Sequence, residues 1–141
     1  MPVRQEQTTL VVHTDGRGLY DISREVCNFT RNAGIETGIL TLFIRHTSAS
    51  LTVQENADPD VRSDLVAALD RLAPEDNRLY RHTCEGPDDM PAHIKSALTD
   101  VSLTIPVTAG SPALGTWQGI YVAEHRAQGH ARQVVCHLMG E

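Results

Sequence analysis

Residues 38–45 read GILTLFIR, an apolar run that is broken only by one threonine before its terminal arginine. This composition favours β-structure. A continuous apolar run of this length is typical of a strand that is covered on both faces. We therefore predict that residues 38–45 form the central strand of a sheet, with His46 at its end.

The residues before this strand predict one more strand and one helix. Residues 8–13 (TTLVVH) have the composition of a strand, and Gly16 and Gly18 predict a turn after it. Across residues 19–33, apolar side chains recur every three or four positions, which places them on one stripe of an amphipathic helix. Gly34 is a natural residue to end that helix, because glycine adopts a left-handed conformation without steric cost.

Two further helices are predicted after the central strand. Asp58, Pro59 and Asp60 favour a helix start, because aspartate caps a helix, proline suits its first position and a second acid complements its dipole. Residues 91–98 predict a short helix with a proline in its first turn. The longer of the two helices is expected to bury an apolar stripe made of Val61, Leu65, Ala68, Leu69 and Leu72.

The last third of the chain is rich in strands. Apolar and polar residues alternate across residues 101–107, and residues 115–124 and 132–138 also have strand composition. Gln128–Gly129 predicts the turn between the last two strands. Consecutive strands favour α+β over a regular βαβ repeat. We expect one domain over residues 1–141, a two-layer α+β fold with a mixed or antiparallel sheet and the helices packed on one side.

The composition limits the classes of partner. The 141 residues carry a formal net charge of −6 and only one lysine, so a broad nucleic-acid surface is not expected. No apolar run approaches the ~20 residues that cross a bilayer, and residues 1–9 lack a signal-peptide core. The three cysteines are far apart and form no C-x-x-C motif, which is typical of free thiols in a reducing setting. We expect a cytoplasmic protein with no membrane or nucleic-acid partner.

Four of the seven histidines lie in polar, turn-rich segments. Neutral imidazole is a common zinc ligand, often in sets of three with one position left open. The spacing fits no compact zinc motif, so a shared site would have to be assembled from separate elements. Separate surface or hydrogen-bonded roles remain the alternative for each histidine. The four are His46, His82, His93 and His125.

Acidic side chains crowd the segment around two of these histidines. Glu85, Asp88 and Asp89 lie between His82 and His93. Carboxylates this close in the chain repel one another unless a cation or basic groups offset their charge. Caps and turns of a solvated loop would account for Asp88, whereas Glu85 fits a ligand, supporting or general-base role better.

A few basic and hydroxyl groups could hold a small phosphate near the same histidines. Lys95 lies on the predicted short helix and Arg126 at the end of a predicted strand, while Thr47 and Ser48 supply hydroxyls. The chain contains no glycine-rich nucleotide motif and no G-x-S-x-G motif of serine hydrolases.

The chain contains four specific motifs: HTSASLTVQENADPDVRSDL (residues 46–65), HTCEGPDDMPAHIKSAL (82–98), IPVTAGSPALGTWQGIYVAEHR (105–126) and RQVVC (132–136). Together they closely resemble the YjbQ-like family, also called UPF0047. The resemblance implies a two-layer α+β fold that assembles as a homotrimer, with a metal site lined by histidines. Members of that family are often described as having a secondary thiamine-phosphate synthase activity.

The resemblance also implies site residues. Two departures from the family pattern are visible: Gln54–Glu55 replaces an asparagine-glutamate pair, and Gly110–Ser111 replaces a Gly-Arg pair, which removes one basic group and puts a phosphate contact there in doubt. The family's histidines match His46, His82, His93 and His125, and its polar motif positions match Glu85, Asp88, Asp89, Lys95, Glu124 and Arg126.

Three hypotheses follow. The first is a metal-dependent transferase similar to the secondary thiamine-phosphate synthases, in which zinc, or magnesium as second choice, is held by three of the four histidines and the substrate is small and phosphorylated. The second is a non-catalytic protein that binds a metal or a phosphorylated metabolite. The third is a structural trimer in which a metal ion only holds the subunits together. The enzyme hypothesis assigns catalysis to Glu85, Asp88, Asp89 and Glu124, substrate binding to Lys95, Arg126, Thr47 and Ser48, and metal binding to His46, His82, His93 and His125.

Overall fold

The computed structural model describes residues 2–141, which form two antiparallel sheets and three α-helices. The elements, in chain order, are β1 (Arg4–His13), β2 (Gly18–Asp21), α1 (Ser23–Ala33), β3 (Gly38–Ile44), β4 (Ala49–Glu55), α2 (Pro59–Leu72), the 3-10 helix η1 (Asn77–Leu79), α3 (Asp89–Leu98), β5 (Ser102–Thr108), β6 (Ser111–Pro112), β7 (Gln118–Glu124) and β8 (Ala131–Gly140). The larger sheet has the order β1-β8-β3-β5-β6, and the smaller sheet has the order β2-β7-β4.

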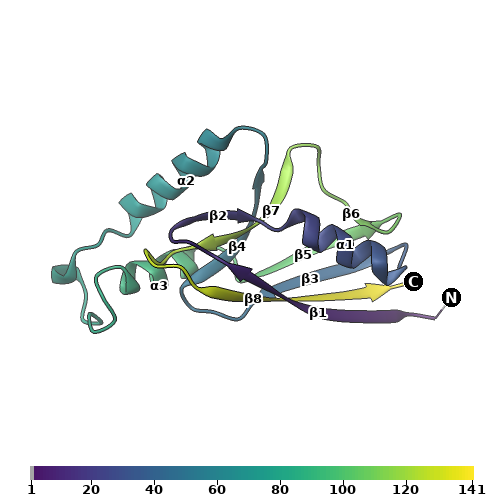
Figure 1. Ribbon diagram of the computed structural model, residues 1–141, viewed down its shortest axis with the longest axis horizontal. Helices are drawn as coiled ribbons and strands as arrows, with labels where there is room; N and C mark the ends of the chain where they lie inside the picture. Colours follow the sequence, from purple (N-terminus) through teal and green to yellow (C-terminus); the bar gives the residue numbers. More distant parts are fainter. Residues whose placement is uncertain (1) are drawn as a thin grey trace.

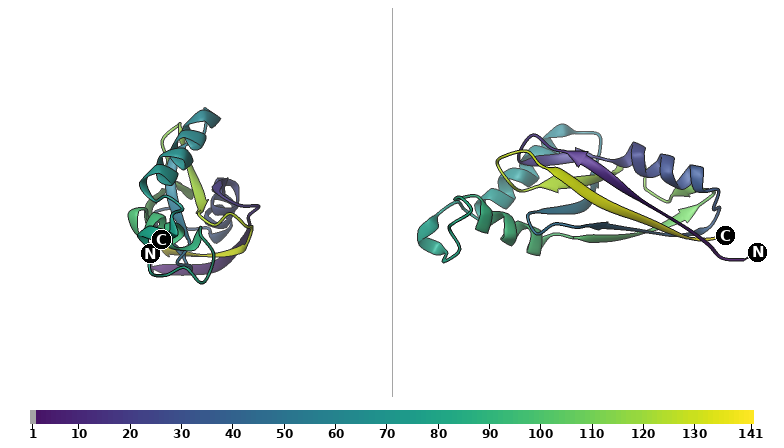
Figure 2. Two further views of the ribbon diagram at one scale, coloured as in Figure 1. Left: turned by 90° about the vertical axis from the view of Figure 1, so that its left-hand side faces the viewer. Right: turned by 60° about the horizontal axis from the view of Figure 1, so that its bottom comes forward.

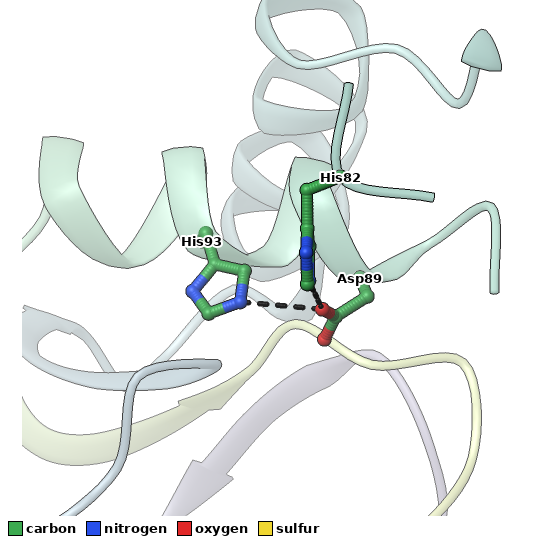
Figure 3. Close-up of side chains that lie close together, drawn as sticks. All are labelled: His82, Asp89 and His93. Atoms are coloured by element: carbon green, nitrogen blue, oxygen red, sulfur yellow. Dashed lines mark hydrogen bonds and ion pairs between the residues drawn. The ribbon is translucent and has the colours of Figure 1, made fainter. Parts of the chain in front are cut away.

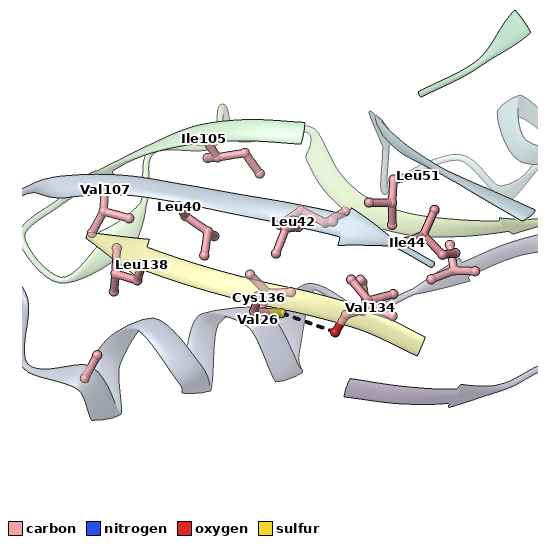
Figure 4. Close-up of a cluster of buried hydrophobic side chains, with 14 of the residues drawn as sticks. Val26, Leu40, Leu42, Ile44, Leu51, Ile105, Val107, Val134, Cys136 and Leu138 are labelled. Atoms are coloured by element: carbon pink, nitrogen blue, oxygen red, sulfur yellow. Dashed lines mark hydrogen bonds between the residues drawn. The ribbon is translucent and has the colours of Figure 1, made fainter. Parts of the chain in front are cut away.

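The hydrophobic core lies between the larger sheet and a second layer made of α1 and the smaller sheet (Figure 1, Figure 2). Leu40 and Leu42 of β3 and Cys136 of β8 point into this core, where they meet Val26 of α1 and Leu51 of β4 (Figure 4). Each of these side chains is fully buried. The observed layers confirm the predicted two-layer α+β fold, and all strand pairs between the described residues are antiparallel.

Strand β3 lies inside its sheet as predicted, between β8 and β5. The prediction that it is covered on both faces is wrong within this chain. Leu40, Leu42 and Ile44 are buried, whereas Ile39 is 56% and Phe43 46% exposed. Successive side chains of a strand point to opposite faces, and the second layer covers only one face of this sheet. The outer face of β3 is therefore apolar and open.

Three strands were not predicted. The two-residue strand β6 pairs with the nearby β5, whereas long-range pairing creates β2 and β4. Residues 18–21 form β2, which pairs with β7, so α1 begins at Ser23 rather than near residue 19. Strand β4 pairs with the other edge of β7, with Leu51 opposite Val122. Neither segment has a strong local pattern of its own, and contacts made elsewhere in the fold override local preference.

Helix α2 begins as predicted but lies against the body only loosely. The Asp58 carboxylate accepts a hydrogen bond from the Asp60 N–H at 2.9 Å, and Pro59 occupies the first helical position. The expected burial of its apolar stripe is wrong, because none of its residues is buried and Leu72 is exposed. Figure 1 shows α2 leaning away from the sheets. No helix within residues 2–141 has both the length and the apolar content needed to cross a membrane.

The end of β7 carries a buried ion pair. Glu124 accepts hydrogen bonds from Arg132 Nε at 2.8 Å and Nη2 at 2.5 Å, and from the Thr14 hydroxyl at 2.6 Å. Burial raises the pKa of the Glu124 carboxyl, but the hydrogen bonds from Arg132 and Thr14 outweigh it, so this pKa lies below its usual value. Glu124 is therefore ionised and ties β7 to β8.

The next residue, His125, is also buried. Its Nε2 lies 2.8 Å from the Ser50 hydroxyl oxygen, and that oxygen accepts a hydrogen bond from the Thr99 hydroxyl at 2.7 Å. Burial, followed by the charge of Lys95, lowers the pKa of His125 to about 4. The ring is consequently neutral at pH 7, and it links β7 to β4 and to the end of α3.

Acid should destabilise this protein through His125. Below about pH 6.5 the unfolded histidine takes up a proton, whereas the folded one stays neutral until about pH 4, so stability is lost as the pH falls between these values. Urea unfolding at one protein concentration should show that His125→Gln loses about 2 kcal/mol less between about pH 7 and about pH 4.5 than the parent does. The exposed His13→Gln is the control, and parallel pH profiles for the parent and His125→Gln would contradict the assignment.

Candidate metal centre

Three side chains converge where the loop after η1 meets the start of α3 (Figure 3). Asp89 is the first residue of α3, and His93 follows four positions later, so the helical repeat places both on one face. His82 reaches them from the preceding loop. Its Nε2 lies 2.7 Å from Oδ2 of Asp89, and Nε2 of His93 lies 3.2 Å from the same oxygen.

This geometry is compatible with a metal ion. The three ligand atoms all lie within 4.8 Å of one another. Tetrahedral zinc with bonds of about 2.0–2.2 Å separates its ligand atoms by about 3.3 Å, so a small opening of the cluster would admit an ion. Without an ion, each imidazole can donate its Nε2–H to the carboxylate. Within residues 2–141, no other group of three histidine, cysteine or acidic side chains converges in this way.

The two histidines of the cluster are open to solvent, whereas the aspartate that they contact is buried. The Asp89 side chain is 7% exposed, whereas those of His82 and His93 are 48% and 35% exposed. A buried carboxylate stays in one orientation, and exposed imidazoles leave room for further ligands. Two nitrogen donors and one oxygen donor with an open side are typical of zinc and other transition-metal sites.

An open groove of about 650 Å³ adjoins the cluster, and His93 belongs to both. Arg45, His46 and Thr47 also line this groove, together with apolar side chains that include Phe43. Arg45 was not among the site residues predicted from the sequence. In the described part of the chain, its guanidinium bonds only to the neutral Gln133 carboxamide, at 3.3 Å.

His46 accepts a hydrogen bond from the backbone. The backbone N–H of Gln133 donates to its Nε2 at 2.8 Å, so the ring is neutral and its own proton is on Nδ1. Burial, followed by the charge of Arg132, lowers the pKa of His46 below its usual value. Since Nε2 is occupied, His46 presents an N–H group rather than a lone pair.

Arg126 contacts the acidic loop beside the cluster. Its Nε donates to Asp88 Oδ2, its Nη1 pairs with Asp89 Oδ1 and its Nη2 donates to the Glu85 carbonyl oxygen, each at 2.9 Å. Burial raises the pKa of the Asp88 carboxyl, but the hydrogen bond from Arg126 and that from the Ala127 N–H bring it below its usual value. The Glu85 side chain itself is exposed.

Lys95 points into the interior. It is 2% exposed, and its Nζ lies 2.5 Å from Oδ1 of Asp70 on α2. Sequence reasoning had no means of identifying Asp70 as this partner, because the pairing depends on how α2 and α3 meet.

The structure thus brings together only part of the predicted site. His82, His93 and Asp89 form one cluster, with Asp88, Arg126 and the Glu85 backbone beside it. The remaining predicted residues have other surroundings: His46 and Thr47 line the groove, Ser48 accepts a hydrogen bond from Arg132, and Glu124, His125 and Lys95 are buried.

Trp117 is the one tryptophan of the chain, and it lies at the surface. The side chain is 65% exposed, in the turn just before β7. Its neighbours Gly115 and Gln118 close this turn through a hydrogen bond at 2.7 Å, which leaves the indole outside.

The fold and these motifs match known proteins. Residues 7–141 match the family described as UPF0047 protein YjbQ-like. The chain is 51% identical over 138 residues to UPF0047 protein sll1880 of Synechocystis sp., covering 98% of this chain and 94% of that protein. It is 45% identical over 136 residues to UPF0047 protein YjbQ of Salmonella typhimurium, covering 96% and 98%.

Proteins of known structure have the same fold as this chain. A conserved hypothetical protein from Thermus thermophilus is 39% identical with a TM-score of 0.80, and the match covers 91% of this chain and 97% of that one. A YbjQ-like protein of unknown function from Sulfolobus solfataricus has the same fold, with a TM-score of 0.91 at 22% identity over 99% of this chain and 100% of that one. Because the family match spans nearly the whole chain and its relatives are this similar, the chain belongs to the YjbQ-like UPF0047 family.

Proposed function

We propose that this chain binds a divalent transition metal through His82, Asp89 and His93 and uses it to recognise a small phosphorylated molecule. The observation that carries the proposal is the convergence of two imidazole nitrogens on one buried carboxylate oxygen. This donor set favours zinc over magnesium, because magnesium prefers oxygen ligands. Three protein ligands leave a position for water or a substrate oxygen.

The groove beside His93 is the proposed site of the phosphorylated ligand. A divalent ion in the cluster supplies Lewis acidity that neutralises phosphate oxygens. Arg45 adds a cation with no acidic partner among residues 2–141, and His46 adds an N–H donor. Phe43 gives the groove an apolar wall for the organic part of the ligand.

The catalytic form of the proposal is a transfer similar to that of the secondary thiamine-phosphate synthases, in which a pyrimidine diphosphate is joined to a thiazole phosphate and pyrophosphate is released. The ion and Arg45 would stabilise the leaving pyrophosphate, and the exposed Glu85 carboxylate lies in the same loop as His82. Pyrophosphate release by zinc-loaded protein that is lost in His93→Ala would support this form.

Non-catalytic binding of a metal or phosphorylated metabolite is the second candidate. It is favoured by one observation: Lys95 and Arg126, which sequence reasoning assigned to the phosphate, are already paired with Asp70 and with Asp88 and Asp89. Tight ligand binding without turnover would support this candidate over the enzyme.

We expect about one zinc ion per chain. His82→Ala and His93→Ala should each weaken zinc affinity at least about tenfold, because each removes one ligand. Elemental analysis of protein purified without an affinity tag, followed by zinc titration, measures both effects.

His13→Ala and His125→Gln are the controls for this experiment, since neither residue belongs to the cluster. A parent protein with no measurable zinc affinity would rule out the metal proposal. Equal losses in all four variants would show that the site is not localised at His82 and His93.

Zinc-loaded protein should bind phosphate, pyrophosphate or thiamine phosphate at millimolar concentration or better by calorimetry. Arg45→Ala should weaken binding by about tenfold, since a hydrogen bond from a charged donor contributes roughly 1.5–3 kcal/mol. Arg24→Ala, on α1 and outside the groove, is the control. If Arg45→Ala leaves phosphate binding unchanged, Arg45 does not contact the ligand.

We also propose a homotrimer. The open outer face of the larger sheet exposes Val11, Ile39, Phe43 and Met139, and an apolar face of this kind is commonly buried between subunits. The number three rests on the family resemblance alone.

Light scattering at micromolar concentration should give three times the chain mass for the parent and a smaller mass for Ile39→Glu, since Ile39 lies on the open face and outside the groove. Asn28→Glu, at an exposed polar position of α1, should leave the assembly intact. A monomeric parent would refute the proposal.

A further inference from the structure

The two carboxylate oxygens of Asp89 have different partners. Oδ2 faces His82 and His93, whereas Oδ1 pairs with Nη1 of Arg126 at 2.9 Å. The side chain is almost completely buried. A carboxylate that is held at one oxygen cannot rotate freely, so the contact with Arg126 sets the direction in which the other oxygen points.

Arg126 is itself fixed by contacts on both sides. Its backbone N–H donates to the buried Glu124 carboxylate at 3.1 Å, at the end of β7. Its guanidinium donates to Asp88 and to the Glu85 carbonyl oxygen, each at 2.9 Å. Asp88 also accepts the Ala127 N–H at 2.9 Å. Arg126 therefore joins the end of β7 to the loop that carries His82 and to the first turn of α3.

The charges around Asp89 are balanced. A lone arginine beside a metal ligand would repel the ion, but the positive charge of Arg126 is offset by Asp88. The charge of Asp89 thus stays available to a cation. The planar guanidinium, with its fixed fork of donors, can orient a carboxylate in a way that a lysine ammonium cannot.

We propose that Arg126 is a positioning residue of the metal centre. It holds Asp89 through Oδ1 so that Oδ2 points at the ion, and it holds the loop of His82 against the end of β7. This inference rests on the proposed metal site. It differs from the phosphate-binding role that the sequence suggested, because the charge of Arg126 is paired with Asp88 and Asp89 and three of its five N–H donors have protein acceptors.

The test compares zinc affinity and the visible spectrum of the Co²⁺-loaded protein for the parent, Arg126→Ala and Arg126→Lys. We expect zinc affinity to fall about tenfold to a hundredfold in Arg126→Ala, as with other residues that orient ligands. Arg126→Lys should recover little of the lost zinc affinity, because lysine restores the positive charge but not the planar set of N–H donors. Both variants should alter the Co²⁺ bands at saturation, since these bands report ligand geometry, which a mere loss of stability would leave unchanged.

Asp88→Asn provides a milder variant in case Arg126→Ala does not fold, and it should shift affinity and spectrum in the same direction. Arg24→Ala is the matched control on α1. A parent that binds metal, together with Arg126 variants of unchanged affinity and spectrum, would overturn the positioning role alone. A parent that binds no metal would overturn the proposed function and this inference with it. If the Arg126 variants lose phosphate binding but keep the metal affinity of the parent, the inference is also overturned, and Arg126 is then a residue that binds the phosphorylated ligand.

Discussion

The antiparallel pairing of β7 on both edges is the constraint on which the rest of this structure depends. β2 and β4 hold β7 from either side, and its residues are buried almost from end to end. Because consecutive side chains of a strand face opposite ways, Glu124 meets Arg132 on one side and His125 meets Ser50 on the other. Where the pairing ends, Arg126 is free to reach the loop before α3.

The candidate metal cluster is built from residues close in the chain and the groove from residues far apart, and His93 belongs to both. The cluster is local: Asp89 and His93 share one face of a helix, and His82 lies a few residues upstream. The groove is not local, since its walls come from the end of β3, the turn after it and α3. One imidazole therefore belongs both to a candidate metal site and to a space large enough for a small organic ligand.

Apolar side chains remain exposed at several places, among them the outer face of β3 and the end of α2. The outer face of β3 exposes Ile39 and Phe43, because GILTLFIR supplies apolar residues to both faces of a strand while the second layer covers only one. The apolar stripe of α2 is likewise left without a buried residue. Isolated exposed apolar side chains are ordinary. Exposed apolar side chains that are neighbours, such as Ile39 and its cross-strand partner Met139, mark a surface where further burial remains available.

Local sequence determined the helices, their capping residues, the inner strand β3 and the crowding of His82, Asp89 and His93, because each depends on neighbours within a few positions. The Asp58–Pro59 start and the four-residue spacing of Asp89 and His93 are of this kind. Tertiary structure alone decided that β2 and β4 are strands and that His46 and His125 lie outside the cluster. His46 and His125 also lie in polar motifs, yet a backbone N–H and a buried serine occupy their ring nitrogens. The physical reason is that strand pairing and burial join residues far apart in the chain, and no pattern within one segment encodes its partner.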